Sequence, residues 1–285
     1  MIKKILVPVR GDGKGDNVLA HASVLAHRFN ALIEVTHCRA RPEDLMPFGV
    51  PIPEMLRKQI VDQSYEIANI EEDTIKEQLH VLAEKLDLDQ TGTKIGSAAS
   101  VSYVEEVGRQ VDVIRRHGRL NDVIAVARPD RDTKLGANTL KAALFHSGRP
   151  VLMCPPVDKT PETIGNRVVI AWNGSSEAAR GLAQGMEIIR EATEVSVLTS
   201  GLDSGPGTTI DDVLSYLALH NVDAKAVKFS AGRNAGAAIL AMCAELGADL
   251  MIMGAYGDSY ERETLFGGNT QTIVDRANLP VLLSH

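Results

Sequence analysis

The feature that most constrains the fold of this chain is an internal repeat. Three pairs of segments match in the same order along the sequence: KILVPVRG (4–11) with RVVIAWNG (167–174), NDVIAVARPD (121–130) with ADLMIMGAYG (248–257), and RPVLMCP (149–155) with LPVLLSH (279–285). The first copy is longer than the second, and its extra residues lie between its second and third predicted strands. Two copies of one unit predict two domains of the same fold.

Within each copy, short apolar runs alternate with amphipathic segments. In the first copy we expect strands at 3–9, 31–38, 99–105, 121–127 and 150–154, and helices at 15–29, 54–86, 108–117 and 137–147. In the second we expect strands at 167–172, 194–199, 224–229, 249–253 and 280–283, and helices at 176–190, 209–220, 234–246 and 269–277. Apolar strands that alternate with helices indicate a parallel sheet covered on both faces. The sequence therefore predicts an α/β fold of two tandem doubly wound domains, 1–156 and 157–285, joined around the linker PPVDKTPETIGN (155–166).

The overall charge and the length of the apolar runs exclude several classes of protein. The net charge of −7 argues against a general binder of nucleic acids or membrane surfaces, which relies on clustered Lys and Arg. No apolar run approaches the roughly 18 residues of a membrane span, and the apolar stretch near the N-terminus is too short for a signal peptide. Three scattered cysteines, Cys38, Cys154 and Cys243, are typical of reduced thiols. We expect a cytoplasmic protein without a membrane or nucleic-acid partner.

A glycine-rich segment follows the fourth predicted strand of the second copy. It reads GAYGDSYERETLFGGNT (254–270) and ends where a helix is expected to begin. Ligands of doubly wound sheets bind at the carboxyl ends of the strands, and the free N–H groups of a helix start favour an anion. The glycines are therefore candidates for a phosphate site. The alternative is a long surface loop in which they serve only as turn residues.

The spacing of these glycines resembles the nucleotide-binding motif of the universal stress protein family, since Gly254-x-x-Gly257 is followed by nine residues and then by Gly267-Gly268-Asn269. Each copy of the repeat looks like one domain of that family, so the chain resembles a tandem universal stress protein over nearly its full length. The resemblance implies a five-stranded parallel sheet of order 3-2-1-4-5 in each domain, and ATP, with or without Mg²⁺, as the ligand. It also implies that VLMC (151–154) and VLLS (281–284) are the matching edges of an intramolecular pseudo-dimer.

By the same resemblance, the residues that contact the nucleotide follow three strands of the second domain. Carried over position by position, they are Met253 and Gly254 near the ribose, Gly257, Gly267, Gly268 and Asn269 at the phosphates, and Ala171, Trp172 and Asn173 at the adenosine end. Thr199 or Ser200, at the end of the second strand of this domain, is a further candidate for contact with the base. Asn173 stands where the family has Asp, so it keeps an acceptor oxygen but lacks the charge. Gly268 stands where Ser is common, and Trp172 has the alternative of packing in the core.

The first copy lacks this motif. Ala127 and Asp130 stand opposite Gly254 and Gly257, the loop is four residues shorter, and Arg10 replaces the Asp of the family. A short loop without paired glycines is poorly suited to wrap a triphosphate. We therefore expect that the first domain does not bind ATP in the manner of the family, and the ligand of this domain stays open.

Three functions are compatible with the sequence. The first is an ATP-binding regulatory or stress-response protein whose C-terminal domain holds the nucleotide, without a dedicated catalytic residue or metal site. The second is a slow Mg²⁺-dependent ATPase that uses the loop carboxylates Asp258, Glu261 and Glu263. The third is an interaction scaffold without nucleotide. A further homodimer is compatible with each of them.

Overall fold

In the computed structural model of the chain, the described residues are 1–9, 15–39, 41, 53–133, 135–156, 159, 161–200, 208–232, 234–257 and 268–285, without the side chains of 64–71. The first half supplies β1 (Lys4–Val9), β2 (Leu32–Arg39), β3 (Ser100–Val107), β4 (Val123–Ala127) and β5 (Val151–Cys154). The second half supplies β6 (Arg167–Ala171), β7 (Glu194–Thr199), β8 (Ala224–Lys228), β9 (Leu250–Gly254) and β10 (Val281–Ser284). The predicted strands agree with these bounds to within two residues at each end.

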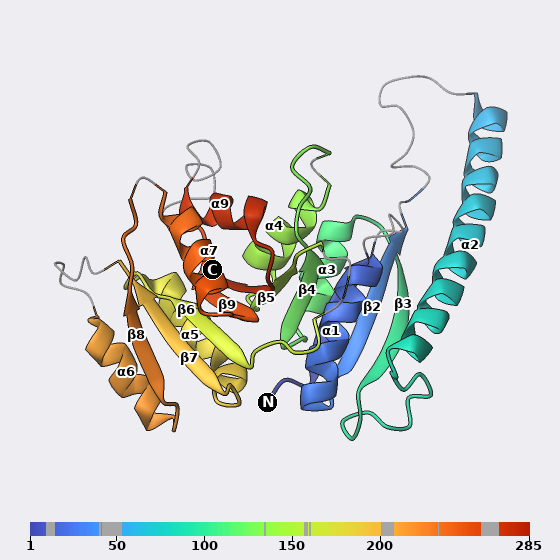
Figure 1. Ribbon diagram of the computed structural model, residues 1–285. Helices are drawn as coiled ribbons and strands as arrows, with labels where there is room; N and C mark the ends of the chain where they lie inside the picture. Colours follow the sequence, from blue (N-terminus) through green and yellow to red (C-terminus); the bar gives the residue numbers. More distant parts are fainter. Residues whose placement is uncertain are drawn as a thin grey trace.

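All of these strands form one continuous sheet in the described part of the chain, with the order β3-β2-β1-β4-β5-β10-β9-β6-β7-β8 (Figure 1). Counted within its own half, each set of five strands has the order 3-2-1-4-5, which confirms the predicted fold class. The strands within each half run parallel. The sequence predicted two sheets, and the structure joins them into one.

Helices cover both faces of the sheet. One face carries α1 (Gly15–Phe29), α2 (Glu54–Lys85), α5 (Ser176–Ile189) and α6 (Ile210–Leu219). The other carries α3 (Gln110–Gly118), α4 (Ala137–His146), α7 (Ala235–Glu245) and α9 (Asn269–Arg276). Each face has its own hydrophobic cluster, and each cluster runs through both halves. Among the described helices, none combines the length and apolar character needed to cross a membrane.

The two halves meet where β5 pairs with β10, and this pair is antiparallel. In register, Leu282 lies opposite Leu152 and Val281 lies opposite Met153. All residues of both strands are buried. The expectation that VLMC and VLLS form the matching edges of an intramolecular pseudo-dimer is confirmed.

Side chains from the first half also hold the second half in place. The guanidinium of Arg28 on α1 donates to the backbone oxygens of Ile164 (2.9 Å) and Glu191 (2.6 Å). Arg128, after β4, donates to the backbone oxygen of Ala277 at 2.7 Å. Both arginines thus satisfy carbonyl groups across the junction. The domain boundary between 156 and 157 lies in the connection from β5 to β6 and stays a prediction, because residues 157, 158 and 160 are outside the described part.

We predict that Leu282→Ala lowers the free energy of unfolding by about 2 to 5 kcal/mol, because the change opens a cavity at the junction of the two halves. Leu282 has no exposed surface. Urea denaturation measures the effect. The matched control is Leu219→Ala, whose side chain is 83% exposed and whose loss we expect to change stability by less than about 0.5 kcal/mol. Equal stability of the two variants would contradict the prediction.

Candidate functional site

The candidate site lies at the carboxyl ends of the central strands of the second half. β6 has β9 on one side and β7 on the other, so the strand order reverses beside it. In register, Ala171 lies next to Met253 on β9 and next to Leu198 on β7. Thr199, the last residue of β7, is buried there. The topology therefore brings the three predicted segments to one edge of the sheet.

The glycine at the end of β9, Gly254, and the glycine three residues later, Gly257, differ in their surroundings. A Cβ on Gly254 would lie 2.4 Å from the backbone nitrogen of Ala178, so α5 packs against β9 at a distance that only glycine permits. Gly257 is exposed, and a Cβ there would lie 3.1 Å from Oε2 of Glu177. Gly254 thus has a packing role, whereas the backbone of Gly257 is accessible to a ligand.

The turn between these glycines is fixed by Tyr256, which sequence reasoning missed. Its backbone is left-handed (φ 57°), although its side chain is buried. The N–H of Tyr256 donates to Oγ1 of Thr270 on α9 at 3.3 Å. Its ring lies 5.7 Å from the ring of Phe145 on α4, in the other half. Left-handed backbone at a bulky residue is rare outside functional or strained positions, and here it directs the turn toward the start of α9.

The start of α9 is a helix N-terminus without a side-chain cap. Gly268 occupies the N-cap position, and the described residues provide no side-chain cap there. Oδ1 of Asn269 accepts the N–H of Gly236 at 3.2 Å, which ties α9 to α7. A helix N-terminus of this kind favours an anion. Gly267 and the carboxylates Asp258, Glu261 and Glu263 lie outside the described residues.

At the predicted adenosine end, the side chains of Asn173 and Trp172 already have structural roles. Oδ1 of Asn173 accepts the N–H of Ser175 (3.1 Å) and its hydroxyl (2.7 Å). Ser175 in turn caps α5 by accepting the N–H of Ala178. The side chain of Trp172 is buried in the core, and within the described residues its Nε1 has no hydrogen-bond partner. The acceptor oxygen of Asn173 is thus already used to shape the start of α5.

A carboxylate that sequence reasoning also missed lies beside the glycines. Glu177 is on the first turn of α5, and its side chain is 13% exposed. Its Oε1 accepts the hydroxyl of Ser176 at 2.8 Å and lies 3.5 Å from the guanidinium of Arg180. The Ser176 hydrogen bond is the main cause that lowers the pKa of Glu177. A fixed negative charge therefore faces Gly257, at the place where the resemblance implies phosphates.

The corresponding loop of the first half closes on itself. Oδ1 of Asp130 accepts the N–H groups of Asp132 and Thr133, each at 3.0 Å. Arg128 is directed to Ala277 in the other half rather than to an open edge. The described part of this loop thus closes through Asp130, while α4, like α9, begins at a glycine N-cap without a side-chain cap. The expectation that this half has no phosphate site therefore rests on the shorter loop without paired glycines. Arg10 lies outside the described residues.

Comparison with known proteins links this geometry to a family. Residues 166–285 match the model of the Universal stress protein family. The second half of the chain belongs to the universal stress protein family. The family resemblance read from the glycine spacing is thereby confirmed for this half. Among curated proteins, the comparison finds no match.

Two solved structures extend the universal stress protein fold to the whole chain. A universal stress protein from Archaeoglobus fulgidus DSM 4304 is 19% identical, with a TM-score of 0.71, and the match covers 99% of this chain and 95% of that chain. A Pseudomonas aeruginosa UCBPP-PA14 protein assigned by name to the same family is 16% identical, with a TM-score of 0.56, and the match covers 99% and 93%. At these identities the matches show the fold. The tandem universal stress protein architecture therefore spans both halves.

Two universal stress protein structures name a nucleotide, cAMP in one and AMP in the other. A family protein from Arabidopsis thaliana is described with AMP bound, and it is 14% identical over 56% of this chain and 96% of that chain. Its TM-score of 0.28 is too low for a residue-by-residue transfer. The AMP is therefore a property of that protein.

We predict that Gly254→Ala lowers the free energy of unfolding by about 1 to 3 kcal/mol, because the added methyl group meets the backbone of α5. Gly257→Ala is the matched control, because the atom nearest to its new methyl group is Oε2 of Glu177 at 3.1 Å, which needs to shift by only a few tenths of an ångström. We expect it to change stability by less than about 0.5 kcal/mol. Urea denaturation of both variants measures the difference, and equal stabilities would show that α5 does not pack on Gly254 as described.

Proposed function

We propose that the second half binds an adenine nucleotide, ATP in the first place, and that binding regulates a stress response. The observation that carries the proposal is the contact between Tyr256 and Thr270. This hydrogen bond holds the glycine turn after β9 next to the uncapped start of α9. The backbone of Gly257 and the N-terminus of α9 then lie at the same edge, and such backbone donors bind phosphate. The choice of adenine nucleotides follows the motif resemblance.

In this proposal the predicted site residues divide into three groups. Met253 and Gly254 line the ribose, while Ala171, Trp172, Asn173 and Thr199 surround the adenosine end. Backbone N–H groups of Gly257, Gly267 and Gly268 and the side-chain amide of Asn269 hold the phosphates. Because the oxygens of Asn173 and Asn269 already accept hydrogen bonds, both side chains are left with N–H₂ donors.

Two observations favour a second candidate, an interaction scaffold without nucleotide. The acceptor oxygen of Asn173 is engaged, and the Glu177 carboxylate faces the glycine turn. Mass spectrometry of the supernatant after heat denaturation of the purified protein separates the candidates. Release of an adenine nucleotide in proportion to protein supports the proposal. Absence of nucleotide, together with no calorimetric binding of ATP, AMP or adenosine, supports the scaffold instead.

We predict that Gly257→Val weakens ATP binding by at least about tenfold, or about 1.4 kcal/mol, because the branched side chain occupies the space beside the backbone N–H. Isothermal titration calorimetry measures the affinity. The control is Ala244→Val, which adds bulk at an exposed position near the end of α7. Unchanged ATP affinity in Gly257→Val, with Ala244→Val also unchanged, would remove the glycine turn from the site.

We also predict that Glu177→Gln tightens ATP binding about tenfold in the presence of a chelator, because it removes a like charge close to the phosphates. Adenosine, which carries no phosphate, should bind both proteins equally. Excess Mg²⁺ should narrow the difference, since the cation neutralises phosphate charge.

Glu194→Gln is the matched control for this charge, because Glu194 is an exposed residue at the opposite end of the sheet, where β7 begins. Calorimetry with adenosine, AMP and ATP gives the comparison. Equal ATP affinities of the original protein and Glu177→Gln without Mg²⁺ would place the phosphates away from Glu177.

A further inference from the structure

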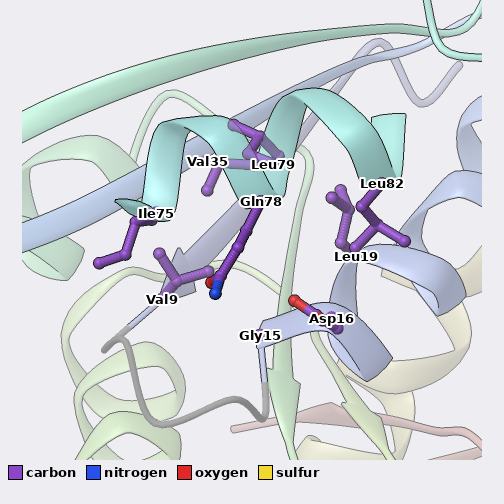
Figure 2. Close-up of a pocket in the computed structure, with 9 residues that line it drawn as sticks. All are labelled: Val9, Gly15, Asp16, Leu19, Val35, Ile75, Gln78, Leu79 and Leu82. Atoms are coloured by element: carbon purple, nitrogen blue, oxygen red, sulfur yellow. The ribbon is translucent and has the colours of Figure 1, made fainter. Parts of the chain in front are cut away.

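The first half contains a pocket that the nucleotide motif does not explain. The pocket lies between α1 and α2, over the carboxyl ends of β1 and β2, has a volume of about 50 Å³ and is partly open to solvent. Its lining residues are Val9, Gly15, Asp16, Leu19, Val35, Ile75, Gln78, Leu79 and Leu82 (Figure 2). The location is the edge at which doubly wound sheets bind ligands.

The internal repeat shows that the pocket is not a necessary consequence of the fold. The matching segments KILVPVRG and RVVIAWNG place Trp172 of the second half at the position of Val9. Both residues lie on the same face of the sheet, where Trp172 is buried within the hydrophobic cluster and Val9 packs at its margin. The second half thus has a larger side chain at this position, and it has the 10-residue α6 where the first half has the 32-residue α2. Both differences change the side chains over the end of the first strand of each half.

The walls of the pocket are apolar, and two polar side chains enter it from opposite sides. Figure 2 shows the carboxylate of Asp16 on α1 and the amide of Gln78 on α2 both turned toward the space between the helices. No Lys or Arg is among the lining residues in the described part of the chain. An apolar cavity with one carboxylate and one amide favours a ligand that donates hydrogen bonds and has no negative charge.

We propose that this pocket binds a small, mainly apolar molecule that carries an N–H donor and no phosphate, with the donor directed to Asp16. Val35 forms the floor, Leu79 and Leu82 enclose the apolar part from α2, and Gln78 supplies a second hydrogen bond. Gly15 is needed for the shape, because a Cβ at this position would lie 2.9 Å from Cγ1 of Val9. This proposal does not depend on nucleotide binding in the second half.

A matched pair of fluorescent probes tests the proposal. N-phenyl-1-naphthylamine is neutral and carries one N–H group, while 8-anilinonaphthalene-1-sulfonate has the same core with a negative charge. We expect saturable binding of the neutral probe and an affinity for the anionic probe that is weaker by about tenfold. Asp16→Asn should reduce this discrimination, because the repelling charge is gone. Equal discrimination in Asp16→Asn would overturn the role of Asp16.

Two variants fill the pocket from opposite walls. Val9→Trp copies the residue of the second half, and Gln78→Trp adds an indole from an exposed position on α2 that places little strain on the core. We expect each variant to abolish saturable binding of the neutral probe. If Val9→Trp does not fold, Gln78→Trp alone tests whether the probe binds in this pocket. Glu77→Trp, at the neighbouring exposed position outside the pocket, is the control and should bind normally. Normal binding by a folded Gln78→Trp protein would overturn the proposal.

Discussion

The antiparallel pair of β5 and β10 is the interaction on which the rest of the structure depends. Both strands are apolar and fully buried, so each would present an unpaired, hydrophobic edge if its half stood alone. Their pairing turns two sheets into one and makes each hydrophobic cluster continuous through both halves. The edges that remain are β3 and β8, where Glu106, Lys225 and Lys228 are among the residues. Charged edge strands resist pairing with another chain, so β3 and β8 are less suited than β5 and β10 to pair with a further copy.

This shared framework presents two different candidate binding edges. In the second half, the left-handed Tyr256 brings the glycine turn to the start of α9, where its N–H donates to Thr270. In the first half, Asp130 instead accepts the N–H groups of Asp132 and Thr133 within its own loop. On the other face of the sheet, the first half has a pocket beside Val9, and the second half has the buried Trp172 at the matching position. The two halves therefore share one strand order but differ in the side chains at the ends of their strands.

The sequence was sufficient for the architecture, because the apolar runs and the repeat predict two α/β halves, and the resemblance to the universal stress protein family implies the strand order and the matching edges. It was insufficient for the site, because the decisive contacts join residues distant in sequence. The spacing of the glycines identified Gly254 but did not reveal that α5 packs against it. Neither Glu177 nor the left-handed Tyr256 has a local sequence pattern, since their roles arise only when α5 and α9 meet the end of β9. Asn173 was read as a ligand residue, yet the N-cap of α5 already uses its oxygen.

The chemistry of the second-half site depends on a balance between backbone dipoles and one carboxylate. The uncapped start of α9 carries partial positive charge that falls off within one helical turn. The carboxylate of Glu177 carries a full negative charge, and its Oε1 is held in place by Ser176 and Arg180. Two like charges about 4 Å apart repel by roughly 1 kcal/mol in water and by several times more where solvent is partly excluded. A ligand with several phosphates therefore meets attraction from α9 and repulsion from α5 at the same edge, and a cation that offsets Glu177 shifts this balance toward binding.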